Sequence, residues 1–356
     1  MKKLFISIVA VGMAMTASAQ QTDKQMATLQ HGDKTTVYYG IDAFVSAYNA
    51  AADTLDVITL SSGEFNVPST ISKSIAVYGA GFERDTITGT ERTYLREGLT
   101  LTHADIKDDD GLTVKAGRHV NGIHLEGLFI NSGVSLVNNN NIPIFNVEIA
   151  KCRISTLALG VVYNCSFRQC FINTLTPIGK DNYCNDILVT NCYINYLKSN
   201  NGIESMWFST ESTIAINNSI LKSLAYKNSE GLFPFYFSNN ISYVNLPSTA
   251  NLINNVFVGS GTPIQDVNGN WTGVPNAALW AAEGEDGSYS EKKDFALKYP
   301  ERYVGNDGTE IGLHGGVYAW NKIPCIPRIT ECTIDTENAS NGTIKVSIKA
   351  EAQTKE

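Results

Sequence analysis

The 356-residue chain is poor in charge and lacks long apolar runs. Charged residues make up 17% of it, and the net charge is −8. No basic stripe is present that would neutralise phosphates, so the sequence predicts no nucleic-acid partner. No segment after Met15 approaches the roughly 20 apolar residues that cross a bilayer, so no membrane-spanning helix is expected. An anionic polysaccharide stays open as a partner because local patches can oppose the net sign.

Common catalytic and metal-binding motifs are also missing. No His or Cys pair has the spacing of zinc ligands, and the Gly-x-Ser-x-Gly turn of serine hydrolases is absent. Asp105 and Asp108–Asp110 offer oxygen ligands for calcium, but their spacing does not match the twelve-residue calcium loop. A solvated acidic loop is therefore the favoured interpretation. We predict no metal site and no cofactor, with calcium as the open alternative.

The N-terminus has the pattern of a bacterial secretory signal peptide, residues 1–19. Lys2 and Lys3 precede the apolar stretch Leu4–Met15, and Ala17-Ser18-Ala19 is a small-residue cleavage site. No Cys follows the cleavage point, which disfavours a lipid anchor. The mature chain is therefore expected to begin at Gln20 and to be periplasmic, attached to the cell surface or secreted.

A recurring frame occupies the middle of the chain: two alternating apolar residues, one polar corner residue, then two more alternating apolar residues. Such a recurrence is typical of a solenoid, whose copies bury their apolar faces by stacking. The cleanest copies are Ile123-Leu125-Gly127-Leu128-Ile130, Val147-Ile149-Lys151-Cys152-Ile154, Ile187-Val189-Asn191-Cys192-Ile194 and Ile214-Ile216-Asn218-Ser219-Leu221, with less regular ones around Cys170, Ile241 and Val256.

The corner positions indicate how the chain turns. They carry residue types that readily adopt the left-handed conformation of a sharp bend. A strand, a one-residue bend and a second strand predict an all-β parallel β-helix. Leucine-rich repeats need a Leu-x-x-Leu-x-Leu lead and a more regular period, and neither is present. The corners are assigned to Gly127, Asn191, Asn218, Asn240 and Asn255.

Seven cysteines leave at least one without a partner inside the chain. Cys152, Cys170 and Cys192 occupy the same frame position, so they are expected to stack about 4.8 Å apart. Side chains that point in parallel orient poorly for a disulfide, so reduced core thiols are favoured there. Cys325 and Cys332, around a Pro-rich segment, are the better disulfide candidates.

The N-terminal part shows a resemblance to a known family. Ile41–Ala51 has helical spacing, as expected of a helix that caps the open end, and the first strand is placed at Val57–Leu60. Gly63–Val67 and the Ser74–Gly81 segment follow. Together with the Asn corners, these features resemble the right-handed parallel β-helix proteins of the pectin lyase-like superfamily, over residues 40–260.

The frame ends near Gly261, where tryptophans, acidic clusters and Pro-rich turns begin. The segment from Asp307 to Ile329 resembles the region after the helix in exported β-helix proteins of Bacteroidetes-type bacteria. We therefore expect a β-helix with its N-terminal cap over residues 20–260, and an irregular C-terminal region over residues 261–356 that closes or covers it. The alternating strand Ile344–Ala350 is expected to seal the second end.

Enzymes that this fold resembles carry charged residues on the outer face of adjacent strands. The outward positions place His124 and Glu126 on one copy, Glu148 on the next, and Ser166 with Arg168 on the one after. These positions make His124, Glu126, Glu148 and Arg168 the catalytic candidates. Solvated surface charge is the competing interpretation, because the clustered aspartates of the family's hydrolases are absent.

A second outward column carries mostly large apolar groups. Its members are Phe129, Arg153, Phe171, Tyr193, Ile220 and Phe257. An uncovered stripe of this kind exceeds what soluble monomers normally expose. The C-terminal region is expected to cover it. In the alternative, Phe129, Phe171, Tyr193 and Phe257 form a stacking platform for a sugar chain or a partner protein.

Two functions remain in competition. The favoured one is an exported protein with a carbohydrate-binding or surface-interaction role and no catalysis, whose partner is a polysaccharide or a cell-surface glycan. The alternative is a polysaccharide lyase or glycoside hydrolase that acts on the outer face. A fold that hosts several activities does not decide between them, and the sequence leaves the oligomeric state open.

Overall fold

The structure is a computed structural model of the chain. It describes residues 25–52, 56–86, 89–102, 106–107, 113–115, 122–137, 143–178, 183–198, 208–209, 211–225, 235–247, 250–325, 328–334 and 346–351. The predicted signal peptide and the acidic run Asp105 to Asp110 that was considered for calcium lie outside the described residues, apart from Ile106 and Lys107.

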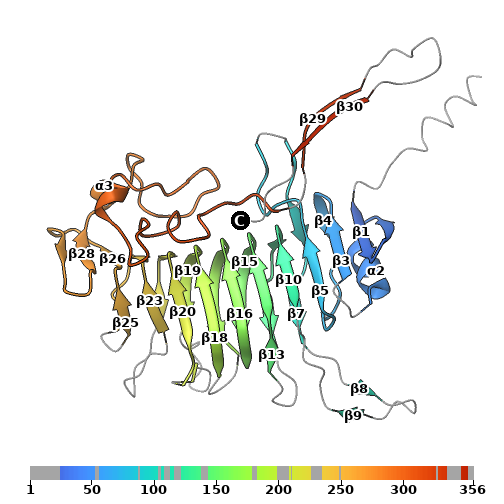
Figure 1. Cartoon of the computed structure of the whole chain (residues 1–356), viewed down its shortest axis with the longest axis horizontal. Coiled ribbons are helices and arrows are strands. Elements are labelled where there is room, and N and C mark those ends of the chain that lie inside the picture. The colour runs from blue at the N-terminus through green and yellow to red at the C-terminus, as the bar shows by residue number, and fades with distance from the viewer. Residues whose placement is uncertain are drawn as a thin grey trace, which may run out of the picture.

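The described chain is all-β, with two long and largely parallel sheets (Figure 1). The first sheet runs in the order β2 (Lys34–Tyr39), β1 (Met26–His31), β3 (Asp56–Leu60), β5 (Ile75–Tyr78), β10 (Ile123–Glu126), β14 (Val147–Ala150), β16 (Val162–Arg168), β18 (Cys184–Thr190), β20 (Ile214–Asn217), β23 (Phe235–Ser238) and β25 (Asn251–Ile253), with β13 (Ile144–Phe145) beside β16.

The second sheet runs beside the first. Its order is β27 (Ile264–Gln265), β28 (Trp271–Val274), β26 (Val256–Val258), β24 (Ile241–Ser242), β21 (Ile220–Leu221), β19 (Tyr193–Lys198), β17 (Phe171–Pro177), β15 (Arg153–Leu159), β11 (Phe129–Ile130), β6 (Thr93–Leu95) and β4 (Gly63–Phe65). Off this path, β12 (Val134–Leu136) pairs with β15 and β7 (Leu99–Leu101), and β22 (Leu224–Ala225) pairs with β19.

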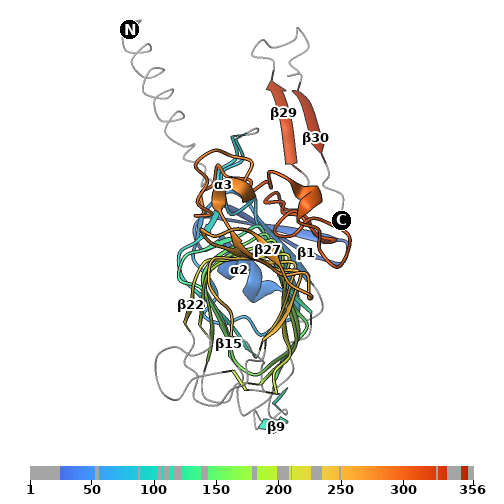
Figure 2. The ribbon, with the colours of Figure 1, turned by 90° about the vertical axis from the view of Figure 1, so that its left-hand side faces the viewer.

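From β14 to β21 the successive strands fall alternately in the two sheets, and each pairs in parallel with the next strand of its own sheet. Ile149 of β14 therefore lies beside Phe167 of β16, and Ile154 of β15 beside Ile172 of β17. All four side chains are fully buried. Because side chains alternate between the two faces of a strand, this register lines the apolar residues up in one core between the sheets (Figure 2).

The bend between the sheets is made by single left-handed residues, as the frame predicted. Gly127, Asn191 and Asn218 have φ values of 72°, 49° and 48°. Two predicted corners are wrong by one residue, because Asn239 and Asn254 have the positive φ (59° and 52°) in place of Asn240 and Asn255. The complete corner column, from the described residues, is Gly127, Lys151, Gln169, Asn191, Asn218, Asn239 and Asn254.

Asn240 and Asn255 point into the core instead. The Asn255 side chain accepts the backbone N–H of Asn240 at 3.0 Å and donates to the backbone carbonyl of Phe237 at 3.0 Å. Asn270 continues this buried amide ladder, since its Oδ1 accepts the Asn255 N–H at 2.9 Å. The shift in register follows from these bonds, which let a polar side chain occupy an interior position without an unpaired group.

The cysteines of the same inward column are reduced, as predicted. Cys152, Cys170 and Cys192 are buried free thiols. The Cys152 and Cys170 backbone N–H groups donate to the sulfur of the next cysteine along the column, at 3.5 and 3.4 Å. Cys325 is also a free thiol, so the predicted disulfide from this residue is absent.

The N-terminal end is closed by a helix and a hairpin. The helix α2 (Ala43–Ala50) lies within the predicted segment and buries Phe44 and Ala47 against the core. Two strands that the sequence did not predict, β1 and β2, precede the helix as an antiparallel hairpin. Because β1 pairs antiparallel with β3, the parallel series stops there. None of the described helices is long and apolar enough to cross a membrane.

The C-terminal region covers one side of the second sheet. Parallel pairing continues beyond residue 260 to β28. The cover segment, residues 276–304, then begins with α3 (Asn276–Leu279), includes a 3₁₀ turn at Pro300–Arg302, and lies above the strands in Figure 1.

Two short hairpins pair apart from the long sheets. They are β8 (Ile106–Lys107) with β9 (Thr113–Lys115), and β29 (Arg328–Ile334) with β30 (Val346–Glu351). In Figure 1 the second hairpin projects from the end of the molecule that carries β1. The prediction that Ile344–Ala350 seals the opposite end is therefore wrong, because β30 finds its partner in β29.

A strap, residues 305–325, runs back along the corner column. Asn239 donates to the Asp307 carboxylate at 3.1 Å, and Asn191 donates to the carbonyls of Leu313 and Gly315 at 2.8 and 2.7 Å. Further along, Gln169 donates to the Ala319 carbonyl at 2.5 Å. The corner side chains therefore both make the bend and hold the strap.

Candidate functional site

The charged cluster lies on the first sheet, where three neighbouring strands carry outward-facing polar residues. Parallel register pairs His124 of β10 with Glu148 of β14, and Glu148 with Ser166 of β16. Glu126 lies two residues from His124, and Arg168 is two residues from Ser166. The predicted neighbours thus come together because outward residues on adjacent strands stand side by side.

His124 lies between two carboxylates. Its Nδ1 is 2.9 Å from Glu148 Oε2, and its Nε2 is 3.0 Å from Glu126 Oε2. An ionised carboxylate only accepts hydrogen bonds, so both ring nitrogens donate and the ring is an imidazolium. The Tyr78 ring packs against it with a centroid distance of 5.0 Å.

Arg168 completes the exposed side of the cluster. Its Nε and Nη2 lie 2.6 and 2.5 Å from Glu148 Oε1. The guanidinium also lies 5.1 Å from the ring centroid of Tyr318 in the strap. Glu148 is the most open member, with 38% of its side chain exposed. Two cations therefore share this carboxylate, one on each oxygen.

Glu126 is covered by the strap, and only 1% of its side chain is exposed. Its Oε1 accepts the backbone N–H of Cys325 at 2.7 Å. The ammonium of Lys151, a corner residue, lies 3.8 Å from the same oxygen. The predicted position of Glu126 on an open outer face is therefore wrong, because the strap removes it from solvent.

Sequence reasoning missed Tyr78, Lys151, Tyr318 and Cys325. Tyr78 could have been predicted from the recurring frame, because it pairs with Glu126 in the register of β5 and β10. Tyr318 and Cys325 arrive on the strap, and no local pattern places them beside residues so distant in the sequence. Lys151 was identified as a corner but not as a charge partner.

The pKa values follow from these contacts. Burial opposes the charged form of His124, but the hydrogen bonds to Glu126 and Glu148 outweigh it and raise the imidazole pKa. Burial also opposes the charge of Glu126, yet bonds from His124 and Cys325 lower its pKa. The bond from His124 is the main cause that lowers the pKa of Glu148 to about 2.

These pKa directions favour an imidazolium at His124 and ionised carboxylates at Glu126 and Glu148. Together with Arg168, these groups form an ion-pair network, and the bond from the Cys325 N–H to Glu126 ties the strap end to it.

The cover segment lies over the aromatic column, which is the first of the two interpretations given for this column. Tyr193 is 1% exposed, and its hydroxyl donates to the Gly287 carbonyl at 2.8 Å. Phe295 of the cover segment packs against it with a ring centroid distance of 5.5 Å. Phe171 is buried in the same cluster and Phe129 packs against its edge. Tyr193 and Phe171 are therefore not available as a sugar-stacking platform, which corrects the alternative prediction.

Phe257 does not belong to this column. It pairs with Ser242, one position further along the strand than the column. Val256 takes the expected place, because it pairs with Ile241, which in turn pairs with Ile220. The one-residue shift has the same origin as the shift of the predicted corners at Asn240 and Asn255.

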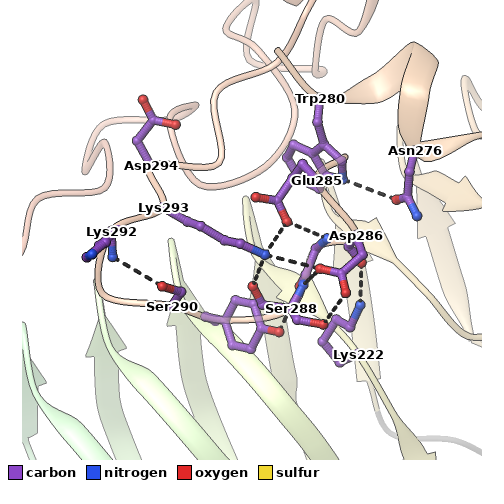
Figure 3. Close-up of polar contacts among 12 residues, drawn as sticks. Lys222, Asn276, Trp280, Glu285, Asp286, Ser288, Ser290, Lys292, Lys293 and Asp294 are labelled. Carbon is purple, nitrogen blue, oxygen red and sulfur yellow. Dashed lines mark hydrogen bonds and ion pairs between the residues drawn. The ribbon is translucent and has the colours of Figure 1, made fainter. Parts of the chain in front are cut away.

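A lysine-centred cluster holds the cover segment in place (Figure 3). The Lys293 ammonium lies 2.7 Å from Glu285 Oε1, 3.1 Å from Asp286 Oδ1 and 2.8 Å from the Ser288 carbonyl. Lys222, which directly follows β21 of the second sheet, donates to the Asp286 carbonyl at 3.0 Å. The three oxygens around the Lys293 ammonium hold the loop of residues 285–288 above the aromatic column.

A cavity of about 640 Å³ lies next to the charged cluster. Its floor carries Thr28 and Thr59, which pair with each other, and Thr59 pairs with Tyr78. The remaining walls come from the loop of residues 80–86, from Thr90 and Glu291, and from residues 322–324 of the strap. Within the described residues, no three His, Cys, Asp or Glu side chains are grouped to hold a metal ion.

The charges at the cavity are paired with one another. Lys322 Nζ lies 2.7 Å from Glu83 Oε2, and Arg84 Nε lies 3.2 Å from Glu91 Oε1. Tyr289 of the cover segment also donates to Glu83. Besides these charged side chains and those of Asp85 and Glu291, the cavity is lined by hydroxyl and apolar groups.

Comparison with protein-family models, with curated proteins and with solved structures finds no match to this chain.

Proposed function

We propose that this chain is an exported, non-catalytic glycan-binding protein built on a right-handed parallel β-helix. Three features support the β-helix: the alternation of successive strands between two sheets from β14 to β21, the in-register parallel pairing, and the helix over one end. The N-terminal pattern of Lys2, Lys3 and Ala17-Ser18-Ala19 supports export to the periplasm, the cell surface or the medium.

The observation that carries the proposal is the saturation of the charged cluster. Each ring nitrogen of His124 already has a carboxylate partner, and Glu126 is closed off by the Cys325 N–H. A lyase or hydrolase needs such groups free to exchange protons with a substrate. A protein that binds a glycan without cleaving it needs only a cavity whose lining can contact the sugar.

The cavity suits a short stretch of a neutral sugar chain. Its volume falls in the range of ligand sites, roughly 300 to 1,000 Å³. The hydroxyls of Thr28 and Thr59 can exchange hydrogen bonds with sugar hydroxyls, while Met26 and Pro324 offer apolar surface to the ring C–H groups. Paired charges around the opening give no strong preference for an anionic chain.

The test uses the mature chain, residues 20–356, with a panel of neutral and acidic polysaccharides, with and without calcium. Retention on an immobilised glycan is measured together with unsaturated-product absorbance and new reducing ends. We expect retention of the protein and intact polymers. Thr59→Trp, which fills the cavity floor, should abolish retention, whereas Thr35→Trp on the exposed strand β2 should preserve it.

Two outcomes contradict the proposal. New reducing ends or unsaturated products that disappear in Glu148→Gln would establish the polysaccharide lyase or glycoside hydrolase alternative, with Glu148 as a group that acts on substrate. Failure of every glycan in the panel to retain the folded protein would remove glycan binding as the function. Circular dichroism of each variant establishes that it is folded.

A further inference from the structure

We propose that Lys151 and Cys325 form a covalent cross-link through a single oxygen atom, N–O–S, which ties the strap to the corner column. Lys151 Nζ lies 3.6 Å from Cys325 Sγ. The two residues are 174 positions apart in the chain, so folding and not local sequence brings them together. This modification site is independent of the proposed glycan binding.

The lysine is unusually well placed to react. Its side chain is 7% exposed, and the carboxylate oxygen of Glu126 lies 3.8 Å from its Nζ, beyond hydrogen-bond distance. Within the described residues, the contact that Nζ makes at hydrogen-bond range is with the sulfur of Cys325. A buried amine directed at a thiol, with no closer oxygen acceptor, is the arrangement that a bridging oxygen needs.

The backbone holds both ends of the bridge in position. Lys151 is a left-handed corner with φ 48°, and its own N–H donates to the Arg168 carbonyl at 3.0 Å. The Cys325 N–H is held by Glu126 at 2.7 Å. Each reacting side chain therefore starts from a fixed backbone, which reduces the entropy lost when the bond forms.

Cys325 is also the most accessible of the six thiols whose burial the structure describes. It is half-buried, whereas Cys152, Cys165, Cys170, Cys184 and Cys192 are fully enclosed in the core. Burial raises the pKa of the Cys165 thiol to about 11, so an interior cysteine of this kind carries little reactive thiolate. An oxidant that reaches the surface therefore meets Cys325 first.

The groups that face the Cys325 thiol are Glu126, Lys151 and, nearby, Tyr78. Burial is the largest cause that raises the pKa of Cys325; Glu126 adds to the rise, and Lys151 opposes it. Formation of the link should accordingly be faster at mildly alkaline pH, where more of this thiol is ionised.

The chemistry balances with hydrogen peroxide as the oxidant. One peroxide converts the thiol into a sulfenic acid and releases one water. A second peroxide accepts the other two electrons as the sulfenic oxygen bonds to the lysine nitrogen, and two more waters leave. The S–H bond and two N–H bonds of the ammonium break, one proton passes to solvent, and one oxygen stays between nitrogen and sulfur.

The test is mass spectrometry of the full mature chain after treatment with dilute peroxide. The expected product is one oxygen heavier and two hydrogens lighter than the untreated chain. After digestion, the peptide that contains Lys151 should be joined to the peptide that contains Cys325, with trypsin no longer cleaving after Lys151. A dithiol should reverse the change, because the N–O–S link is reducible.

Two variants keep the proposal falsifiable. Lys151→Arg retains the charge but lacks the amine, and Cys325→Ser lacks the sulfur; both should lose the cross-linked product while remaining folded. Peroxide should also raise the unfolding temperature of the wild-type chain and leave that of Lys151→Arg unchanged.

Three results would overturn the cross-link. One is a chain that gains oxygen at Cys325 without losing two hydrogens. Another is a Cys325–Cys332 disulfide, which loses two hydrogens and gains no oxygen. The third is that the peptides containing Lys151 and Cys325 stay unmodified under conditions that oxidise the exposed Met26.

Discussion

Replacing Glu148 by Gln removes the carboxylate that joins His124 to Arg168. A carboxyl whose pKa falls on folding from 4.5 to about 2 stabilises the native state by roughly 3 kcal/mol at neutral pH when nothing screens it. Because 38% of the side chain is exposed, solvent screening reduces this to about 1 to 2 kcal/mol. We expect Glu148→Gln to lower the free energy of unfolding by that amount at pH 7.

The sign of the pH dependence follows from the lowered pKa. Above pH 4.5 Glu148 is ionised in both states and its contribution is fully present; it is lost as the pH falls from 4.5 towards about 2. Urea unfolding of wild type and Glu148→Gln at a series of pH values measures the difference. It should shrink below pH 4.5. Glu97→Gln, the same substitution at an exposed position outside the cluster, is the matched control.

The contribution of His124 to stability has the opposite pH dependence and is lost at higher pH. Its pKa is raised above 6.5 in the native state, so its contribution is present below 6.5 and is lost as the pH rises through the folded value. Glu148→Gln should weaken this loss, since one of the two carboxylates that raise the His124 pKa is gone. A stability difference that is the same at every pH, or no difference at pH 7, would refute the ion-pair description of the cluster.

Two further predictions concern the bends between the two sheets. Asn255→Ala removes a fully buried side chain with four hydrogen bonds and should lower the free energy of unfolding in urea by about 3 to 5 kcal/mol. The control Asn251→Ala, at an exposed position, should change it by no more than about 0.5 kcal/mol. Equal effects of the two substitutions would contradict the buried ladder. Gly127→Ala places a Cβ 2.8 Å from Pro324 Cβ, on a residue whose φ is 72°. This change should lower the free energy of unfolding by about 2 kcal/mol or more and increase proteolysis of the strap. An unchanged unfolding temperature would contradict this prediction.

Most of the correct predictions about core positions, bends and neighbouring residues came from the recurring frame in the sequence. Alternation with a period of two placed Ile149 and Val189 in the core, and the slip of one residue marked Gly127, Asn191 and Asn218 as left-handed bends. The neighbours His124 and Glu148 followed from the same register. The frame failed by one residue at Asn240, because asparagine fits both a left-handed bend and a buried, fully bonded interior position.

Side-chain periodicity records which face of a strand a residue occupies and which residues lie beside it on the next strand, so the parallel sheets, the cysteine column and the charged neighbours were determined by the sequence. The bonds of Asn191 and Glu126 to the strap join residues 122 and 199 positions apart, and that of Tyr193 to the cover segment spans 94 positions, where no period relates the partners. Only the tertiary structure therefore decided that Glu126 is enclosed, that Tyr193 is covered, and that Lys151 faces Cys325. The path of an irregular chain over a surface depends on the sum of many weak contacts, and no single segment encodes it.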